Sequence, residues 1–425
     1  MARKKVKCSR HVAVEPDVVW ARVRDFCAPW HPLIATMEAE DGGQIRAFTV
    51  KGEDTVYRER LTWFSDTDRT FGYTLLEGIT GAQHYAGRMT VSASVKGGSF
   101  VTMSAEIEAL AARVEEIAEG TKAAFDIGLE SLDGLERTPL GSSAPAAKAA
   151  PTSPVIFDNL PRLALDVTPA QEGPLCLFLH GIGGNRSNWQ GQVSLAGTLT
   201  RAAALDLRGY GDSSLGAGQS TVDDYCDDIL RVADTLGATR LILCGLSYGA
   251  WIATAFAEKY PEKMAGLILS GGCTGMSEAG PDEREAFRVS REIPLDEGQS
   301  PADFAPAVVE IIAGPNASAK ARSIMLESMT AIPTETYRDA LRCFTNPLKQ
   351  FDFSKLDMPV LMMTGEHDVL APPGEIKSVA TRIHAATARS DVQFEMIRGA
   401  GHLCNVEAPE LYNKPMMEFL HRVAR

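Results

Sequence analysis

The segment 245–249, GLSYG, holds a serine between two glycines. Residues 241–244 before it have the composition of a buried strand, and residues 250–258 after it that of a helix. A G-x-S-x-G turn between a strand and a helix strains the backbone, so that the serine hydroxyl stands clear of it beside a helix N-terminus. The pattern predicts that Ser247 is a nucleophile. A chance match on a surface loop is the alternative, and the flanking strand and helix disfavour it.

An acid and a base follow two later apolar segments. Asp368 ends the sequence GEHD after residues 360–364, and His402 ends GAGH after residues 392–397. If these segments are parallel strands, both side chains lie at the carboxyl edge of the sheet, where open α/β sheets build their sites. The chain order Ser247, Asp368, His402 predicts a catalytic triad. Asp368 would orient the imidazole, and His402 would take the serine proton and pass it to the leaving group.

A glycine-rich loop, HGIGG at 180–184, follows the apolar segment 175–179. Such a loop lets backbone N–H groups point at a ligand, so we expect the N–H groups of Ile182 and Tyr248 to form an oxyanion hole. A phosphate-binding loop is the alternative, but the spacing fits neither GxGxxG nor GxxxxGK(S/T). His180 is expected to brace the loop rather than to act as a base.

Four further residues are candidates for substrate binding. Arg284, Arg288 and Arg291 are spaced i, i+4, i+7 and share one face of a predicted helix, where they would clamp a substrate carboxylate. The alternative is a solvated face whose arginines pair with neighbouring acids. Trp189 either lines the pocket or braces the HGIGG loop, and the sequence leaves both open.

The larger part of the chain, 155–425, alternates short apolar strands with helix-length segments. This rhythm predicts a doubly wound, mostly parallel sheet. The strands are expected at 175–179, 202–205, 241–244, 266–270, 360–364 and 392–397. The stretch from 271 to 359 is too long for one crossover helix, so we expect an inserted helical cap at about 276–341.

Residues 1–137 are expected to form a separate domain, because residues 138–154 have the Pro, Ala and Ser content of a linker. The expected order is a strand, a short helix, a run of strands and one long helix, at 6–14, 15–26, 44–50, 55–63, 70–76, 86–95, 100–107 and 109–132. This order predicts an α+β fold in which the sheet curls around the long helix and leaves a cavity between them.

The motifs of residues 155–425 resemble the α/β-hydrolase superfamily. HGIGG, LDLRGYGDS, GLSYG, GEHD and GAGHLCNVEAPELYN stand in the family's order, and HGIGGNRSNW and HLCNVEAPELYN look most like the 3-oxoadipate enol-lactonase group. The resemblance implies hydrolysis of a carboxylic ester or lactone without a cofactor, and it places the acid last in GEHD, at Asp368. Tyr248 stands where the closest relatives usually have Met, so the acyl pocket is expected to differ.

Residues 5–135 resemble the START-like, polyketide-cyclase (SRPBCC) superfamily. The resemblance rests on PDVVWARVRDF, on WHP at 30–32 and on the strand pattern after them. It implies a helix-grip fold whose cavity takes an apolar or aromatic ligand. Six aromatic residues would line this cavity or belong to the core: Trp20, Trp30, Trp63, Tyr73, His84 and Tyr85.

Composition limits the partners and the compartment. With a net charge of −13, the chain lacks the basic surface that binding to nucleic acids or anionic membranes requires. The sequence has no apolar run of about 18 residues that would span a membrane and no signal peptide, so we expect a cytoplasmic protein. The eight cysteines have no C-x-x-C spacing, which argues against a disulfide framework or a zinc site, and no metal is expected.

Three alternatives to an ester or lactone hydrolase stay open. The same fold would cleave a C–C or amide bond, or transfer an acyl group. The chain would be a binding protein for an apolar ligand if the START-like cavity were its functional part. The START-like domain would otherwise deliver an aromatic substrate to the hydrolase or form a homodimer.

Overall fold

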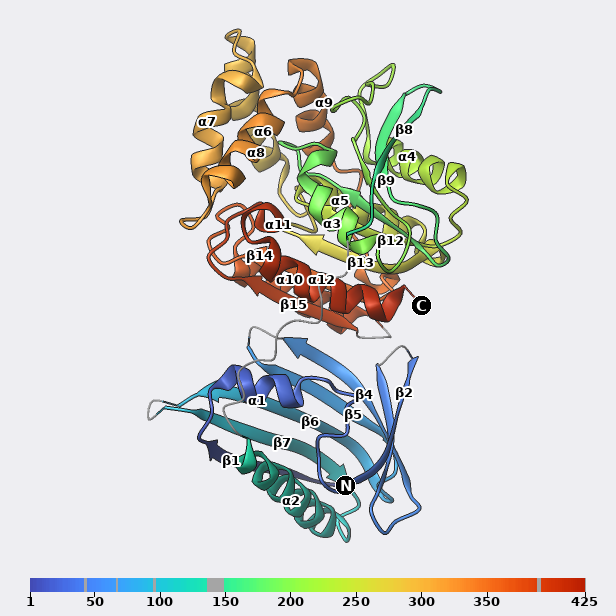
Figure 1. Ribbon diagram of the computed structural model, residues 1–425, viewed down its shortest axis with the longest axis vertical. Helices are drawn as coiled ribbons and strands as arrows, with labels where there is room; N and C mark the ends of the chain where they lie inside the picture. The colour runs from blue at the N-terminus through green and yellow to red at the C-terminus, as the bar shows by residue number, and fades with distance from the viewer. Residues whose placement is uncertain (42–43, 66–67, 95–96, 136–148, 388–390, 425) are drawn as a thin grey trace. The chain divides into compact units, whose positions relative to one another are not determined.

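The computed structural model describes residues 1–41, 44–65, 68–94, 97–135, 149–387 and 391–424. They divide into two compact units, Met1–Pro145 and Ala146–Arg425, which are drawn in Figure 1. The predicted linker, 138–154, lies outside the described residues as far as 148. Its last two residues belong to a strand that begins at Ser153, so regular structure starts earlier than the sequence predicted.

The first unit is an antiparallel sheet that packs against a long helix (Figure 1). The strands pair in the order β1-β7-β6-β5-β4-β3-β2. Helix α2 packs on β1 and β7, and its apolar side chains enter the core of the unit. This arrangement confirms the predicted helix-grip fold. The elements are β1 Ala2–Val12, α1 Pro16–Val23, β2 Ile34–Glu40, β3 Ile45–Val50, β4 Val56–Ser65, β5 Thr70–Glu77, β6 Ala82–Ala93, β7 Ser99–Ala109, α2 Val114–Glu130 and the 3₁₀ helix η2 Ser131–Gly134.

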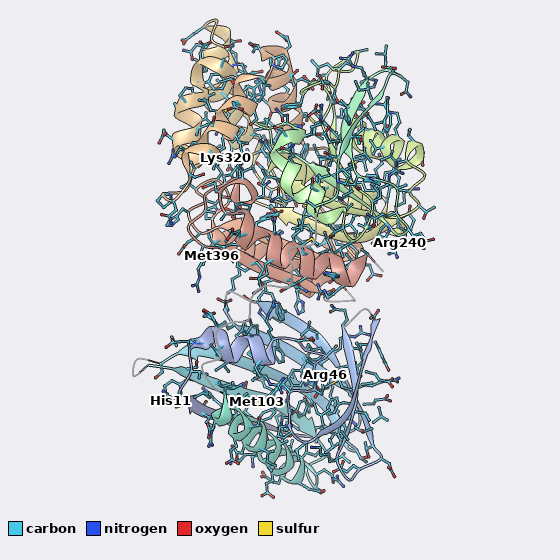
Figure 2. All side chains as sticks on the ribbon, viewed as in Figure 1. His11, Arg46, Met103, Arg240, Lys320 and Met396 are labelled. Atoms are coloured by element: carbon cyan, nitrogen blue, oxygen red, sulfur yellow. The ribbon has the colours of Figure 1, made fainter. Side chains whose placement is uncertain are left out.

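The interior of this unit contains an ion pair as well as apolar side chains. Arg46 of β3, labelled in Figure 2, donates from Nε to Glu59 of β4 at 2.7 Å, and both side chains are about nine-tenths buried. Arg46 also donates to the carbonyl oxygen of Phe26 and lies over the rings of Phe26 and Tyr73. A buried charge is tolerated where it is paired and hydrogen-bonded in this way.

The six aromatic residues expected at the cavity of the first unit differ in burial. Trp20, Trp30, Tyr73 and Tyr85 are each less than 10% exposed and belong to one core cluster. Trp63 is half-buried, and His84 is exposed. His84 therefore does not line the interior, because its side chain faces solvent.

The second unit is a mostly parallel sheet with helices packed against it, as predicted. The strand order is β8-β9-β11-β10-β12-β13-β14-β15, with β8 and β9 antiparallel at one edge. Apart from the cap helices, the elements of this unit are β8 Ser153–Phe157, β9 Leu163–Val167, β10 Leu175–Leu179, η3 Arg186–Trp189, α3 Gln190–Ala196, β11 Ala202–Leu205, α4 Val222–Thr235, β12 Leu241–Leu246, α5 Tyr248–Lys259, η4 Pro261–Lys263, β13 Met264–Ser270, η5 Phe353–Lys355, β14 Val360–Gly365, α10 Pro373–Ala386, β15 Val392–Ile397, α11 Cys404–Glu407 and α12 Pro409–Val423.

Burial of both faces explains why the parallel strands of this sheet are continuously apolar. In β10, Cys176 and Phe178 join the cluster that contains side chains of α3 and α12, whereas Leu177 faces the other way and is also fully buried. Helix α4 packs on α5, and α5 packs on β12 and β13. The sheet is thus covered on both sides.

Four α-helices lie between β13 and β14 and form the cap (Figure 1). They are α6 Pro281–Asp296, α7 Pro301–Ile312, α8 Ala319–Thr330 and α9 Thr334–Phe344. The predicted end of the cap, at residue 341, falls inside α9. Helix α6 packs on α9 and α7 packs on α8, so the cap consists of two helix pairs.

Candidate active site

Ser247 lies on a strained turn between β12 and α5. Its φ of +54° and ψ of −113° are values that side-chain-bearing residues rarely adopt, and they are typical of a nucleophile elbow. A Cβ at Gly245 would collide with the carbonyl of Gly249, and a Cβ at Gly249 would collide with the carbonyl of Leu179. The two glycines are therefore required by close backbone approach, as the G-x-S-x-G pattern implies.

Asp368 and His402 form a buried hydrogen-bonded pair. The imidazole Nδ1 lies 2.8 Å from Asp368 Oδ2, and Oδ1 of the same carboxylate accepts the N–H groups of Leu370 and Ala371 at 2.9 Å. Burial raises the pKa of Asp368, but the interactions with His402 and with the two backbone N–H groups outweigh it, and the pKa is lowered. Asp368 is thus held as an anion against the imidazole.

Two adjacent glycines after β13 bring the serine and the imidazole together. A Cβ at Gly271 would lie 3.1 Å from His402 Nδ1 and 3.3 Å from Asp368 Oδ2. A Cβ at Gly272, the next residue, would lie 3.4 Å from Ser247 Cα. Gly271 thus lies against the Asp368–His402 pair, and the next residue, Gly272, lies against Ser247. Ser247 and the Asp368–His402 pair therefore converge at one end of the sheet. Glu366, the other carboxylate of the GEHD sequence, accepts the N–H of Gly399 at 2.9 Å.

The HGIGG loop lies directly against the serine. A Cβ at Gly181 would lie 3.3 Å from Ser247 Cβ. The hydroxyl of Tyr210 donates to the carbonyl of Ile182 at 3.1 Å, which turns the carbonyl away and fixes the peptide. Among the residues that the structure describes, the N–H groups of Ile182 and Tyr248 have no protein acceptor. Both are free to donate to a ligand oxygen.

His180 braces the loop, in line with its expected role. Its Nε2 accepts the N–H of Leu207 at 3.0 Å, and its Nδ1 lies 2.8 Å from the carbonyl oxygen of Gly181. Burial lowers the pKa of His180, so the ring is neutral, with Nδ1 the donor. Both ring nitrogens are engaged, which leaves neither for proton transfer.

Glu407 holds the loop that precedes His402, and the sequence reasoning did not single it out. Its Oε2 accepts the N–H of Gly401 at 2.9 Å and the N–H of Gly314 at 2.7 Å. The N–H of His402 donates to the carbonyl of Ile312 at 2.8 Å. The end of cap helix α7 is thereby bonded to the histidine loop. The position of Glu407 within GAGHLCNVEAPELYN was the available signal.

The predicted substrate-binding residues have unequal surroundings. Trp189 is fully buried between the rings of Phe178 and Tyr412, so it belongs to the core under the HGIGG loop and does not line an open pocket. Arg288 pairs with the carboxylates of Glu285 and Glu292, as expected for a paired face rather than a free clamp. Arg284 and Arg291 are half-buried, and both lie on the face of α6 that carries Arg288.

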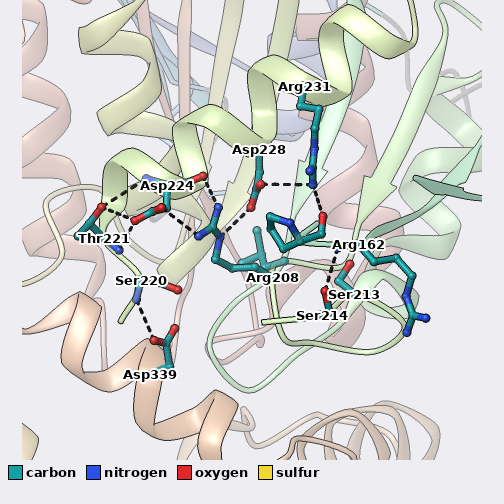
Figure 3. A network of polar contacts seen from close by, with 12 residues as sticks. Arg162, Arg208, Ser213, Ser214, Ser220, Thr221, Asp224, Asp228, Arg231 and Asp339 are labelled. Atoms are coloured by element: carbon teal, nitrogen blue, oxygen red, sulfur yellow. Dashed lines mark hydrogen bonds and ion pairs between the residues drawn. The ribbon is translucent and has the colours of Figure 1, made fainter. Parts of the chain in front are cut away.

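A polar network joins the cap to the rest of the second unit (Figure 3). Arg208, from the LDLRGYGDS segment, donates to Asp228 of α4 at 2.8 Å and pairs with Asp224. The N–H of Ser220 donates to Asp339 of cap helix α9 at 2.9 Å. Both partners of the Arg208–Asp228 pair are nearly fully buried, so the network fixes the core and cap on either side of this segment.

Metal clusters and membrane-spanning helices are both absent from the parts of the chain that are described. No cluster of three His, Cys, Asp or Glu side chains there has the arrangement of a metal site. No helix within those parts has the length and apolarity to cross a bilayer. Cys273 and Cys404 are buried, and burial raises the pKa of both thiols, that of Cys273 to about 12, which disfavours a reactive thiolate.

Comparison with known proteins agrees with this architecture. Residues 176–414 match the family model described as alpha/beta hydrolase family, and residues 3–135 match polyketide cyclase / dehydrase and lipid transport. A 2-(acetamidomethylene)succinate hydrolase of Mesorhizobium japonicum is 28% identical over 62% of this chain and 93% of its own length.

Solved structures give the same assignment. A thermophilic esterase of Thermogutta terrifontis has a TM-score of 0.55 and 26% identity, covering 65% of this chain and all of the esterase. An enol-lactonase of Burkholderia xenovorans LB400 shares the fold, with a TM-score of 0.53 and 20% identity over 63% of this chain and 99% of its own. The chain belongs to the alpha/beta hydrolase family, with a polyketide cyclase-type domain at residues 3–135.

Proposed function

We propose that this hydrolase is a serine enzyme that cleaves a carboxylic ester or lactone through an acyl-enzyme. Ser247 is the nucleophile, His402 the general base and acid, and Asp368 the group that orients the imidazole. The single observation that carries the proposal is the convergence at one sheet end of a strained serine and a buried Asp–His pair. That constellation performs acyl transfer on several unrelated folds.

The proposed mechanism follows from the hydrogen bonds. Because Asp368 accepts from Nδ1, the neutral imidazole leaves Nε2 unprotonated, and Nε2 takes the proton of Ser247 Oγ. The serine oxygen attacks the carbonyl carbon, and the N–H groups of Ile182 and Tyr248 stabilise the oxyanion. His402 then protonates the leaving alcohol, and water repeats the sequence to release the acid. Each donor of an oxyanion hole typically contributes about 2.7–4 kcal/mol.

The test of the nucleophile compares Ser247→Ala with a matched variant, Ser323→Ala. Ser323 is an exposed serine of cap helix α8 that bonds to Glu327. We expect Ser247→Ala to lose turnover of p-nitrophenyl butyrate by about 10⁴–10⁶-fold and to lose labelling by a fluorophosphonate probe. Ser323→Ala should keep both. Unchanged turnover by Ser247→Ala would refute the proposal.

The scissile bond is tested with a substrate panel. The panel contains an enol-lactone, short aryl esters, an N-acyl amide and a vinylogous C–C substrate. Preference for the enol-lactone or the esters supports the proposal. Preference for the amide or C–C substrate would indicate that the same three residues catalyse amide or C–C bond hydrolysis instead.

We also propose that the first unit binds an apolar or aromatic ligand, in keeping with its four buried aromatic residues. Native mass spectrometry of residues 1–425 would detect a retained molecule. The hydrolase proposal does not depend on it.

A further inference from the structure

Two buried hydroxyl groups beside the nucleophile turn make no hydrogen bond. Tyr248 directly follows Ser247, and Tyr225 of α4 packs edge-on against Tyr248 at a ring-centroid distance of 5.6 Å. Each tyrosine is 1% exposed. Within the described residues neither hydroxyl has a hydrogen-bond partner, and nor does the indole N–H of Trp251, whose ring lies 5.5 Å from that of Tyr248. Three polar groups are therefore buried side by side without partners.

The polar neighbours of these hydroxyls come from cap helix α9. The hydroxyl of Tyr248 lies near that of Tyr225 and near the thiol of Cys343, but neither pair reaches normal hydrogen-bond geometry. Asp339 lies one turn before Cys343; its Oδ1 accepts the N–H of Ser220 at 2.9 Å, and its Oδ2 is buried with no partner in the described parts of the chain. Burial raises the pKa of Tyr225 and of Cys343, and the charge of Asp339 raises both further, so this carboxylate belongs to the same cluster.

The chemistry of the cluster defines its missing partner. Buried polar groups in native proteins are almost always hydrogen-bonded, because a buried group without a partner destabilises the fold. The tyrosine hydroxyls can donate and the Asp339 carboxylate can only accept, so the partner must accept and donate at once, as a hydroxyl does. An anionic partner is disfavoured beside Asp339. Arg208 lies over the ring of Tyr225 at 5.3 Å, but its charge is already paired with two aspartates of α4.

The cluster adjoins the proposed oxyanion hole. The backbone N–H of Tyr248 is one of the two proposed oxyanion donors, and its side chain is the centre of the cluster. Tyr210, whose hydroxyl donates to the carbonyl of Ile182 in the oxyanion loop, also interacts electrostatically with Tyr225. Phe344 of α9 covers Tyr248 from the cap side at a centroid distance of 5.7 Å. A substrate held at the nucleophile would therefore reach these hydroxyls with a group that extends under the cap.

We propose that the hydroxyls of Tyr225 and Tyr248, together with Asp339, bind a neutral hydroxyl group of the substrate. The two tyrosines donate to the oxygen of this group, and its hydrogen is donated to Asp339 Oδ2. The substrate class is then an ester or lactone that carries a hydroxyl away from the scissile carbonyl. Tyr225 and Tyr248 become specificity-determining residues, and the rings packed around them favour an aromatic substrate. This inference rests on the proposed function.

The kinetic test uses two series of paired esters. The first contains phenyl esters of phenylacetic, phenylpropanoic and phenylbutanoic acid, with and without a para hydroxyl on the acyl ring. The second contains butyrate esters of phenols with and without a para hydroxymethyl group, which places the hydroxyl on the alcohol side. In wild type, kcat/KM should be about tenfold or more higher for the hydroxylated member of at least one pair. Tyr225→Phe should lower that ratio by about 3–10-fold, and Tyr225→Phe with Tyr248→Phe by about 10–100-fold.

Tyr260→Phe is the matched control. Tyr260 follows the end of α5, is half-buried and packs on Phe256 at a centroid distance of 5.0 Å, so its replacement should keep the wild-type ratio. A ratio near one for every pair in wild type would overturn the proposal. A hydroxyl preference that survives in Tyr225→Phe and in the double variant would overturn it as well, because buried water would then satisfy the two tyrosines.

A binding measurement separates this inference from the proposed reaction. Calorimetry on Ser247→Ala with the same paired esters reports recognition without turnover. Tighter binding of a hydroxylated ester that is lost when Tyr225→Phe is added supports the site, even if wild type hydrolyses no ester and the proposed function fails. Hydrolysis of the esters without a hydroxyl preference in rate or affinity keeps the proposed function and overturns the inference. Each variant should unfold cooperatively in urea, and Tyr248→Phe repeats the comparison if Tyr225→Phe does not fold.

Discussion

Removing the carboxylate of Glu407 should lower the free energy of unfolding, because this side chain bonds the end of α7 to the loop before His402. Its Oε2 accepts the N–H groups of Gly314 and Gly401, and both glycines are buried. A hydrogen bond to a charged acceptor contributes about 1.5–3 kcal/mol and one to a neutral acceptor about 0.5–1.5 kcal/mol. Glu407→Gln keeps one side-chain oxygen that can accept both N–H groups but loses the charge, so we expect a loss of about 2–3 kcal/mol in the free energy of unfolding. Glu407→Ala leaves two buried donors unpaired, which costs about 2–6 kcal/mol.

Chemical denaturation by urea measures this series, with Glu410→Gln as the control. Glu410 is exposed and three positions further on, so its replacement should change stability by about 0.5 kcal/mol or less. Because His402 follows Gly401 directly, kcat should also fall, by up to about 10²-fold for a displacement near 1 Å, with a smaller change in KM. If Glu407→Ala unfolds at the same urea concentration as Glu410→Gln, the bonds to Gly314 and Gly401 do not carry the stability assigned to them.

Three other outcomes are expected. Asp368→Asn should lower kcat by about 10⁴-fold with little change in substrate binding, because the amide favours the wrong imidazole tautomer; a loss below tenfold contradicts the assigned role. The pKa of Asp368 is lowered in the folded chain, so in acid the unfolded chain binds more protons than the folded chain. The stabilisation that ionised Asp368 gives the folded chain is therefore complete above about pH 4 and is lost as the pH falls through the folded pKa. Urea midpoints measured from about pH 6 to pH 3 should fall less steeply in Asp368→Asn. A thiol reagent at pH 8 should label Cys27 first and the seven buried cysteines only on unfolding; fast reaction of several thiols in the native state would contradict the packing.

The sequence predicted best where burial alone decides the pattern. The strands at 175–179, 202–205 and 392–397 have the predicted bounds, because both faces of a parallel strand are buried and the apolar run ends where the strand ends. The antiparallel edge strands Ser153–Phe157 and Leu163–Val167 were missed. Ser153–Phe157 is mostly exposed, so its composition resembles that of the preceding linker. Leu163–Val167, by contrast, is buried at every residue but Asp166, so its apolar pattern was present in the sequence.

The first unit was predicted less sharply for a related reason. Strand β7 alternates buried residues with more exposed ones, so its ends are marked only by turns. Strand Ile34–Glu40 has no fully buried residue to mark it. The long helix begins at Val114 rather than at 109, because Ala109 completes the register of strand β7 with Ala2 of β1. Pairing between distant strands decided that boundary, and no local pattern records it.

At this candidate site, the glycines mark the positions where two segments of backbone approach most closely. Gly181 lies against Ser247 and Gly271 against His402, each so close that a Cβ would press on that side chain. Gly314 and Gly401 approach so closely that a Cβ on either would strike the backbone of the other's segment. The polar residues of a triad state which chemistry is available, but they occur in many loops. Glycines at strand ends record how closely the backbones approach, so the glycine-bearing motifs say more about the geometry of the candidate site than its titratable residues do. Gly314 lies outside those motifs, in the cap, and the bond from Glu407 to this residue was correspondingly missed.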